Sequence, residues 1–525
     1  MMNKQSPVFG ALLTCFAACL LLTLFSWPLA LAPSEWVLGA SHNDFYSIAW
    51  GLEHVARSLM SGEWPGASTT RLQWPEGGVL LIADFPETLL ISPITALFGP
   101  TVAFNVLQFL HHGLAAGAAW WCARRLGVSP IAALVAAMAF GFAPALTGNT
   151  YNQNPDVTPW YWVPLTVGFA ATAVDRKGAV LAGLCAGAAT WCNPYGGVMS
   201  ALSLVILLPW RRRRDAAVCG VLALAVVGGG AALMTWWSVT SDASLLMKGK
   251  RLSPFHGVAS LKGLFWPVPS VLSQSDWPEH AKYVHWSYLG ITLLVMGLWG
   301  WVREREWRWI GLFGVAVFCA LGPDLLLSET QRLGPSPYRL IDVLPGWNRL
   351  HLNHRYTALA VLVLGLGSAK LVSNWGRKGL WVVLLVGVDL LGTSGGWHLL
   401  KPQRPYDDGT CALLKDLEPG PVIDVPGTHG EFWLYAATCH GNPVAEGINR
   451  PIVLRTQRNL NRNGIDQGLR TLRLAGYRYL VFHLEVPRRS TGEFRELLEQ
   501  GQDCIVASNA QGVSVLDIQD CPAAD

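Results

Sequence analysis

Charged residues are scarce in this sequence, and their scarcity excludes an ordinary water-soluble protein. Only 14% of the 525 residues are charged, whereas a typical soluble domain has about a quarter. The net charge of +4 is small, so the composition does not indicate a nucleic-acid partner. Internal repeats, which are common in secondary transporters, are not detectable. Half of the sequence is hydrophobic: 51% of residues are apolar, in long runs that indicate a polytopic α-helical membrane protein.

The apolar runs predict about eleven transmembrane helices of about 15–25 residues each. The stretches are roughly 9–31, 100–122, 129–147, 157–174, 179–193, 195–210, 216–238, 286–302, 309–327, 355–373 and 380–398. Within 179–210, "TWCNPYGG" is either a tight turn between two spans or a break in one. Ala30 and Ala32 would suit a signal-peptide cleavage site, but the long apolar run before them favours an uncleaved anchor.

Short basic clusters set the predicted orientation of these spans. If Lys4 is cytoplasmic, every cluster falls on the cytoplasmic side, as the positive-inside rule requires. The clusters are Arg124–Arg125, Arg176–Lys177, Arg211–Arg214, Arg303 with Arg305 and Arg308, and Arg377–Lys378. A transmembrane domain is therefore predicted over 1–398, with the long loops 32–99, 239–285 and 328–354 on the outer face.

Residues 399–525 are too many and too polar for a loop, and they predict a small external α/β domain. "PVIDVP" and "YRYLVFHL" are typical of buried strands, and "GEFRELLEQG" is typical of a helix. "CIVASNAQGVSVLDI" predicts a hairpin that turns at Asn509–Gly512. The four cysteines of the tail allow two disulfides in three connectivities. Because Cys504 and Cys521 flank the hairpin, that pair is favoured; buried thiols are the alternative.

An acid and an amphipathic stretch follow the first span. From Asp44 onward, apolar residues recur on one helical face, while Glu53 and Arg57 pair on the other face. Such a helix is expected to lie along the outer membrane surface. Asp44 is then either the cap of this helix or a functional acid held just above the bilayer.

Three more carboxylates lie in outer segments. Asp84 and Glu87 stand in the apolar stretch "LLIADFPETLLISPITALFG", in which Pro86 and Pro93 indicate a short helix rather than a span. Asp156 stands at the outer entrance of the fourth span. Ionisable groups at membrane depth are costly and by default mark functional cavities. The four acids are therefore predicted to converge, and they could hold a divalent cation such as Mg²⁺ or Mn²⁺.

Basic residues that could face these acids also lie outside. Arg355 begins the tenth predicted span, where a cation is well placed for a lipid phosphate. Lys250 and Arg251, in "MKGKRLSPFHG", are further candidates, with simple solvation or contact with lipid headgroups as the alternative. The candidate residues of the surrounding cavity are His42, Asn43, Asn154, Asn193 and Tyr195.

The order of these features resembles the GT-C membrane glycosyltransferases, such as the protein mannosyltransferases and the aminoarabinose transferase of lipid A. One span is followed by an external acid, an amphipathic segment ending near "SGEWP", a short P-x6-P-x-x-x-LFG helix over 86–99, and the second span. "LQWPEGGVLL", "SPYRLIDVLPGWNRLHLNHRYTALAVL" and "CHGNPVAEGINR" are similar to a bacterial branch of that superfamily, so the resemblance covers nearly the whole chain.

This resemblance implies an activity, its partners and a location. The donor would be a polyprenyl-phosphate-linked sugar, the acceptor an envelope glycan, lipid or protein, and the location the outer face of the bacterial inner membrane. Asp44 would be the general base or would orient the acceptor, and cationic groups would stabilise the departing lipid phosphate. No second acid stands beside Asp44 in His42-Asn43-Asp44-Phe45, so the use of a metal stays open.

Two other functions fit parts of the sequence. A flippase or transporter of a lipid-linked glycan fits the membrane domain, although repeats are usual in transporters. A non-catalytic envelope-assembly protein on a GT-C scaffold, with the tail as a docking module, would not depend on the external acids. A transfer activity that depends on those acids would indicate the enzyme and exclude the non-catalytic assembly protein.

Overall fold

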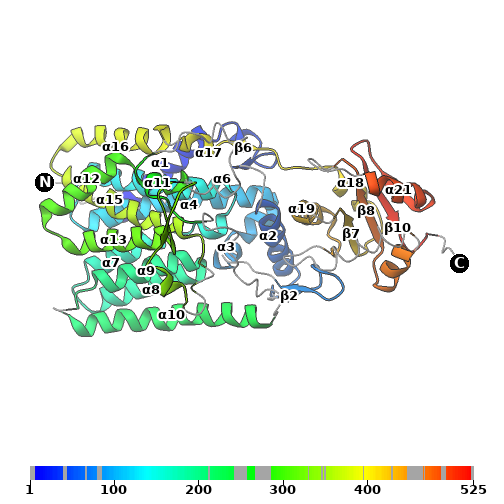
Figure 1. The fold of residues 1–525 in the computed structure, drawn as a ribbon, viewed down its shortest axis with the longest axis horizontal. Coiled ribbons are helices and arrows are strands. Elements are labelled where there is room, and N and C mark those ends of the chain that lie inside the picture. Colours follow the sequence, from blue (N-terminus) through cyan, green and yellow to red (C-terminus); the bar gives the residue numbers. More distant parts are fainter. Residues whose placement is uncertain are drawn as a thin grey trace.

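The computed structural model describes a bundle of helices and a smaller four-stranded sheet, which lie end to end along the long axis (Figure 1). The helices of the bundle come from the chain before residue 400, and the sheet comes from the chain after residue 421. The described residues are 6–39, 44–65, 68–79, 85–210, 213–241, 257–266, 285–328, 330–343, 347, 350–393, 395–426, 430–445, 465, 467–485 and 492–521.

Helices form over every apolar stretch that predicts a span. Several of them begin with proline, whose missing N–H costs nothing at the first helical position. The helices are α1 (Pro7–Phe25), α4 (Pro100–Arg125), α5 (Pro130–Gly141), α6 (Pro144–Tyr151), α7 (Trp162–Ala171), α8 (Arg176–Cys192), α9 (Pro194–Leu207), α10 (Arg214–Ser241), α12 (Ile291–Glu304), α13 (Trp307–Leu321), α15 (Thr357–Leu371), α16 (Gly379–Gly387) with a π-helix over Val388–Thr393, and α17 (Gly396–Leu399).

Asn193 divides the ambiguous stretch 179–210 into two helices. Its backbone ends α8, and its side-chain Oδ1 accepts hydrogen bonds from the N–H groups of Tyr195 (2.8 Å) and Gly196 (3.2 Å) at the start of α9. This is an N-cap, which asparagine fills well. The interpretation of "TWCNPYGG" as a tight turn is therefore confirmed.

The number of membrane spans is not confirmed. Among the described residues, α1 is the one helix long and apolar enough to cross a membrane alone, and α5 with α6, bent by 40°, qualifies as a broken span. The long helix α4 carries the buried polar residues Asn105, Gln108, His111 and His112. These polar side chains lower the mean hydropathy of α4. About eleven spans therefore stay a prediction.

Two shorter helices lie at the end of the bundle that faces the sheet (Figure 1). α2 (Phe45–Met60) and α3 (Phe85–Phe98) pack against each other and against α4, and α2 also packs against α19 (Gly430–His440). The rings of Phe45 and Tyr46 contact Phe104 on α4 and Phe432 on α19, at centroid distances of 5.0 and 4.6 Å. Protein therefore covers the apolar face that the sequence places on the membrane surface.

The predicted Glu53–Arg57 pair forms, with Glu53 buried and the Arg57 side chain 44% exposed. The second carboxylate oxygen of Glu53 binds Nη2 of Arg71 at 3.0 Å. Arg71 also lies over the ring of Trp50, and its backbone carbonyl accepts a hydrogen bond from Val444 N (3.0 Å). Arg71 thus connects α2 to the sheet unit, in which Val444 forms a bridge with Val422 of the sheet.

The sheet forms from the segments predicted as strands. β7 (Val422–Val425) and β8 (Tyr479–His483) are parallel, and β9 (Ile505–Ser508) and β10 (Val513–Asp517) form the predicted hairpin, in the order β7-β8-β10-β9. β7, β8 and β10 are buried along their whole length. Near the sheet lie α18 (Thr410–Lys415), α19 and α21 (Gly492–Gln500). The strands, the hairpin and the helix over 492–500 are confirmed.

Two disulfides cross-link the segments around this sheet. Cys504 is bonded to Cys521, as the hairpin predicts, and Cys411 on α18 is bonded to Cys439 on α19. Cross-links of this kind stabilise a domain by about 2–4 kcal/mol each, mainly by restricting the unfolded chain. The second pair depends on the packing of α18 on α19, which the sequence pattern does not show.

A buried histidine joins three parts of the sheet unit. At the end of β8, Nδ1 of His483 lies 2.7 Å from Asp408 Oδ2, and Nε2 lies 2.9 Å from Asp424 Oδ1 on β7. The indole of Trp433 on α19 stacks on the imidazole with centroids 3.4 Å apart. Burial alone would lower the pKa of His483, but the hydrogen bonds and negative charges of the two aspartates raise it.

We expect the stability of the sheet unit to fall as the pH rises above neutrality. A histidine with a raised pKa stabilises the folded state fully below its unfolded value, about 6.5. That contribution is lost as the pH rises through the folded pKa, at up to about 1.4 kcal/mol per pH unit. Hydrogen exchange of β7, β8 and β10 at a series of pH values, corrected for intrinsic rates, would measure how the free energy of unfolding changes with pH. If the free energy of unfolding changed with pH in the same way in His483→Gln, His483 would not be the residue responsible.

Candidate functional site

Several predicted site residues lie outside the described residues: His42, Asn43, Asp84, Lys250 and Arg251. Their roles stay predictions. The described candidates are Asp44, Glu87, Asn154, Asp156, Asn193, Tyr195 and Arg355.

Asn105 on α4 binds the segment Pro33–Leu38, which precedes Asp44 in the chain, through side-chain hydrogen bonds. Its side-chain Oδ1 accepts a hydrogen bond from Leu38 N (3.0 Å), and its Nδ2 donates to the carbonyls of Pro33 (2.9 Å) and Trp36 (2.7 Å). Gly39 then passes close to the end of α6: a Cβ built there would lie 2.3 Å from the Thr150 carbonyl, and its φ is +90°. A larger residue would not fit, so glycine is needed at this crossing.

Asp44 stands at the N-terminus of α2 and is half-buried. Its backbone occupies the N-cap position, but its carboxylate does not accept the capping hydrogen bond from the first turn of α2. An aspartate at this position usually makes that bond. The side-chain bond that the capping interpretation predicts is therefore not formed, and the next residues, Phe45 and Tyr46, are buried.

Glu87, on α3, is engaged at both carboxylate oxygens. Oε2 meets Nε2 of His111 on α4, and Oε1 accepts a hydrogen bond from the Tyr161 hydroxyl just before α7. The other nitrogen of His111 lies 2.8 Å from Oγ1 of Thr158. Glu87, His111 and Thr158 are all buried. This network connects α3, α4 and the segment before α7, and it leaves neither oxygen of Glu87 without a partner.

Asp156 lies in the turn η2 (Pro155–Val157), just before the predicted span 157–174. Asn193 Nδ2 donates to its backbone carbonyl at 3.2 Å. Burial raises the pKa of the Asp156 carboxyl, while the charges of Arg355 and His111 oppose that rise. Asn154 begins the same turn and is also buried.

Arg355 is 5% exposed, in the turn η7 (Asn353–Tyr356) that leads into α15. Its guanidinium lies 4.8 Å from the centre of the Tyr195 ring, and the Tyr195 hydroxyl accepts a hydrogen bond from Leu352 N (3.0 Å). In the described part of the chain, Nε of Arg355 and Oδ1 of Asp156 have no hydrogen-bond partner. A buried polar atom left unpaired costs about 1–3 kcal/mol, which favours a bound ligand or water here.

More unpaired polar atoms surround this point. Within the described residues, these are both side-chain polar atoms of Gln153, Oδ1 of Asn154 and the hydroxyl of Tyr356. Native structures leave few such atoms. Their accumulation between η2 and η7 defines a polar centre within an apolar bundle.

The structure thus brings together most of the described candidates. Asn193 joins Asp156 to Tyr195, Tyr195 underlies Arg355, and the charge of Arg355 reaches Asp156. Asp44 stands at the start of α2. Sequence reasoning missed Asn105, His111 and Gln153. A signal was present for His111 and Asn105, because both are polar residues inside the predicted span 100–122.

The divalent cation stays a prediction, because Asp84 and His42 lie outside the described residues. Nowhere in the described ranges do three His, Cys, Asp or Glu side chains form a group that could hold a metal. Both oxygens of Glu87 already have partners. We therefore derive no step through a metal ion.

Solved structures share this fold. Arabinofuranosyltransferase AftD from Mycobacteria superposes with a TM-score of 0.56 at 15% identity, over 98% of this chain and 40% of AftD. ArnT from Cupriavidus metallidurans, bound to undecaprenyl phosphate, gives a TM-score of 0.54 at 12% identity, over 96% of this chain and 97% of ArnT. The chain thus spans less than half of AftD. No family model and no curated protein matches the sequence.

Both neighbours are membrane glycosyltransferases of the GT-C class. This chain has the GT-C fold, as the order of its sequence features predicts. At identities of 12% and 15%, the similarity establishes the fold and not the activity.

Proposed function

We propose that the protein transfers a sugar from a polyprenyl-phosphate donor to an envelope glycan, lipid or protein on the outer face of the membrane. The observation that carries this proposal is the buried Arg355, whose Nε has no hydrogen-bond partner in the described part of the chain. Arginine suits phosphate oxygens, which its planar fork of donors can bind in pairs. ArnT, which shares the fold, was solved with undecaprenyl phosphate.

The proposed chemistry is a single displacement at the anomeric carbon. The acceptor hydroxyl gives its proton to the carboxylate of Asp44, and its oxygen forms the new bond to the sugar. The bond between the anomeric carbon and the phosphate oxygen breaks, and its electron pair leaves with the polyprenyl phosphate. Arg355 stabilises the charge that develops on this phosphate. The products are the glycosylated acceptor and polyprenyl phosphate.

The other acids and amides position the reactants in this proposal. Asp156 lies opposite Arg355 and orients the acceptor, helped by Asp84 and by the cavity residues His42, Asn43 and Asn154. Glu87 acts through His111, because both of its oxygens are occupied. Asn193 holds the turn that contains Asp156. The ring of Tyr195 supports the guanidinium of Arg355. Lys250 and Arg251 provide further positive charge for the donor phosphate.

The accumulation of donor in a deletion strain tests this function in cells. Loss of the enzyme blocks consumption of its lipid-linked sugar, so one polyprenyl-phosphate sugar should rise in the membrane lipids. Complementation with the wild-type chain should reverse the rise, whereas Asp44→Asn should not. An unchanged set of polyprenyl-phosphate sugars would contradict the proposal. Chelation with EDTA in the same membranes would show whether Mg²⁺ or Mn²⁺ takes part.

The proposed orientation places the sheet unit outside the membrane and the basic loops inside. Arg470→Cys, in the exposed part of the sheet unit, should react with an impermeant maleimide in spheroplasts. Arg377→Cys, in an exposed predicted cytoplasmic loop, should react only after permeabilisation. The opposite pattern would overturn the orientation and with it the outer-face chemistry.

A further inference from the structure

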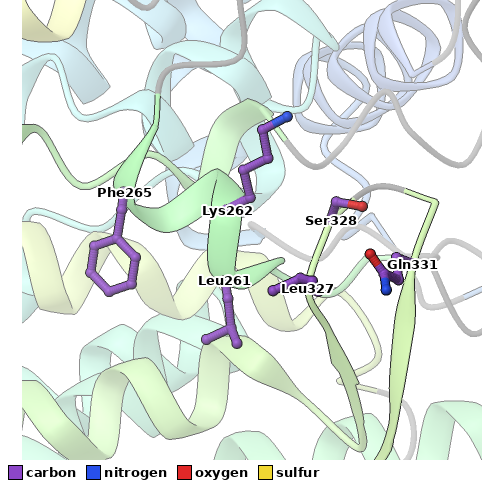
Figure 2. A pocket seen from close by; sticks show the side chains of 6 residues that line it. All are labelled: Leu261, Lys262, Phe265, Leu327, Ser328 and Gln331. Carbon is purple, nitrogen blue, oxygen red and sulfur yellow. The ribbon is translucent and has the colours of Figure 1, made fainter.

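A cavity of about 540 Å³ lies between α11 (Leu261–Phe265) and the hairpin of β4 (Asp324–Leu326) and β5 (Arg332–Pro335) (Figure 2). None of its described lining residues belongs to the proposed site. The contacts that bear on the proposed chemistry lie elsewhere, around the first turn of α2, which begins directly after Asp44.

An aromatic cluster surrounds the two residues that follow Asp44. Phe45 and Tyr46 are both fully buried. The ring centroid of Phe45 lies 5.0 Å from that of Phe104 on α4 and 5.2 Å from that of Tyr435 on α19. The ring centroid of Tyr46 lies 5.7 Å from that of Tyr435. Aromatic rings attract one another at centroid distances of about 4.5–7 Å, so Tyr435 holds both residues.

The hydroxyl groups of this cluster make contacts of their own. The Tyr435 hydroxyl lies 2.9 Å from Oγ1 of Thr101, in the first turn of α4. The Tyr46 hydroxyl accepts a hydrogen bond from the backbone N–H of Tyr406 (2.8 Å), in the segment that leads from the bundle to α18. Tyr435 therefore connects the first turn of α2 with the first turn of α4.

The sheet unit fixes the helix that carries Tyr435. Cys439, one turn further along α19, is bonded to Cys411 on α18. Leu434 and Ala437 of α19 belong to the same buried apolar cluster as residues of β7, β8 and β10. In Figure 1, α19 lies between α2 and the sheet. The sheet therefore supports α19 on one side, while Tyr435 contacts α2 on the other.

We propose that Tyr435 is a positioning residue for Asp44, so that the sheet unit takes part in the transfer reaction through α19. This inference rests on the proposed role of Asp44 as the base. Asp44 is bonded directly to Phe45, and its carbonyl accepts the first helical hydrogen bond of α2, from Ile48 N (2.9 Å). A shift of the Phe45 and Tyr46 rings therefore moves Asp44 as well. Misplacement of a reacting group by about 1 Å can lower the rate about 10²-fold.

Steady-state transfer by the purified full chain tests this role. The donor is the polyprenyl-phosphate sugar that accumulates in the deletion strain, and envelope extract supplies the acceptor. Tyr435→Ala should lower kcat by about 10²-fold and leave the donor KM unchanged, because the proposed phosphate contact is Arg355. Tyr435→Phe, which keeps the ring and loses only the hydroxyl contact with Thr101, should lower kcat by about fivefold.

A double variant shows whether Tyr435 acts through Asp44. Residues that act as a unit have non-additive effects on the rate. Adding Tyr435→Ala to Asp44→Asn should therefore leave the residual transfer rate of Asp44→Asn unchanged.

Leu480→Ala is the control for a general loss of stability in the sheet unit. Leu480 is fully buried, and it packs with Leu497 and Leu516 in a cluster that contains no residue of α19 among the described residues. Leu480→Ala should lower the melting temperature and leave kcat unchanged.

Three results would overturn the proposal. The first is a wild-type kcat in Tyr435→Ala, or in Tyr435→Phe if the alanine variant does not fold. The second is an equal loss of kcat in Leu480→Ala. The third is a loss from Tyr435→Ala that is as large in Asp44→Asn as in the wild type. In each case the wild type still transfers sugar, and the proposed function stands. A wild type that transfers none would overturn the proposed function, and this inference with it.

Discussion

Arg355→Gln should lower the affinity for a polyprenyl-phosphate donor by roughly 30-fold or more. Removing one partner of a buried, hydrogen-bonded charge pair costs about 2–5 kcal/mol, and Arg355 is 5% exposed. Glutamine keeps a donor group and some of the packing on Tyr195 but removes the charge. Binding of undecaprenyl phosphate to the purified protein, measured by tryptophan fluorescence or by native mass spectrometry, gives the change in affinity directly.

The control for this experiment is an arginine that is exposed. Arg404 forms an ion pair with Glu35 at 3.1 Å, and their side chains are 66% and 60% exposed. Such surface pairs contribute about 0–1 kcal/mol, so Arg404→Gln should leave donor affinity unchanged. If Arg355→Gln binds the donor as tightly as Arg404→Gln does, the phosphate lies elsewhere.

Asp44→Asn should reduce the transfer rate by about 10²- to 10⁴-fold, which is the typical effect of losing a general base. Asparagine caps a helix as well as aspartate does, so a purely structural Asp44 would tolerate this change. The measurement is single-turnover transfer from a short-chain donor, with folding checked by melting temperature.

Asp175 provides the matched control for Asp44. It is the N-cap of α8, and its carboxylate accepts a hydrogen bond from Gly178 N at 2.8 Å. Asp175→Asn should therefore be neutral, and Asp175→Ala should cost about 1 kcal/mol of stability with little change in rate. If Asp44→Asn transfers sugar like the wild type while Asp44→Ala lowers only the melting temperature, Asp44 is structural and the mechanism is wrong.

The helices, the strands and much of the polar centre could be predicted from the sequence because they follow local rules. Apolar run length placed the helices, and short apolar runs bounded by turn residues placed β7 to β10. The cost of a polar group at membrane depth pointed to Glu87, Asp156 and Arg355. The same rule applied to α4 would also have identified Asn105 and His111.

The parts that could not be predicted depend on contacts between distant segments. The covering of α2 by α19, the contact of Arg71 with Val444, and the Cys411–Cys439 bond each join segments that local periodicity treats separately. The occupation of both Glu87 oxygens by His111 and Tyr161 is of the same kind. An amphipathic face shows that a helix is covered on one side, but the sequence does not show whether protein or lipid covers it.

Release of polyprenyl phosphate by the purified, membrane-reconstituted protein tests the central claim most directly. A short-chain polyprenyl-phosphate sugar labelled in both parts is supplied with envelope extract as acceptor. Transfer predicts that the wild type separates the two labels over time, while Asp44→Asn and Arg355→Gln leave them together. Movement of the doubly labelled donor across the bilayer with its sugar bond intact, and equally in all three proteins, would contradict a glycosyltransferase and show a lipid transporter.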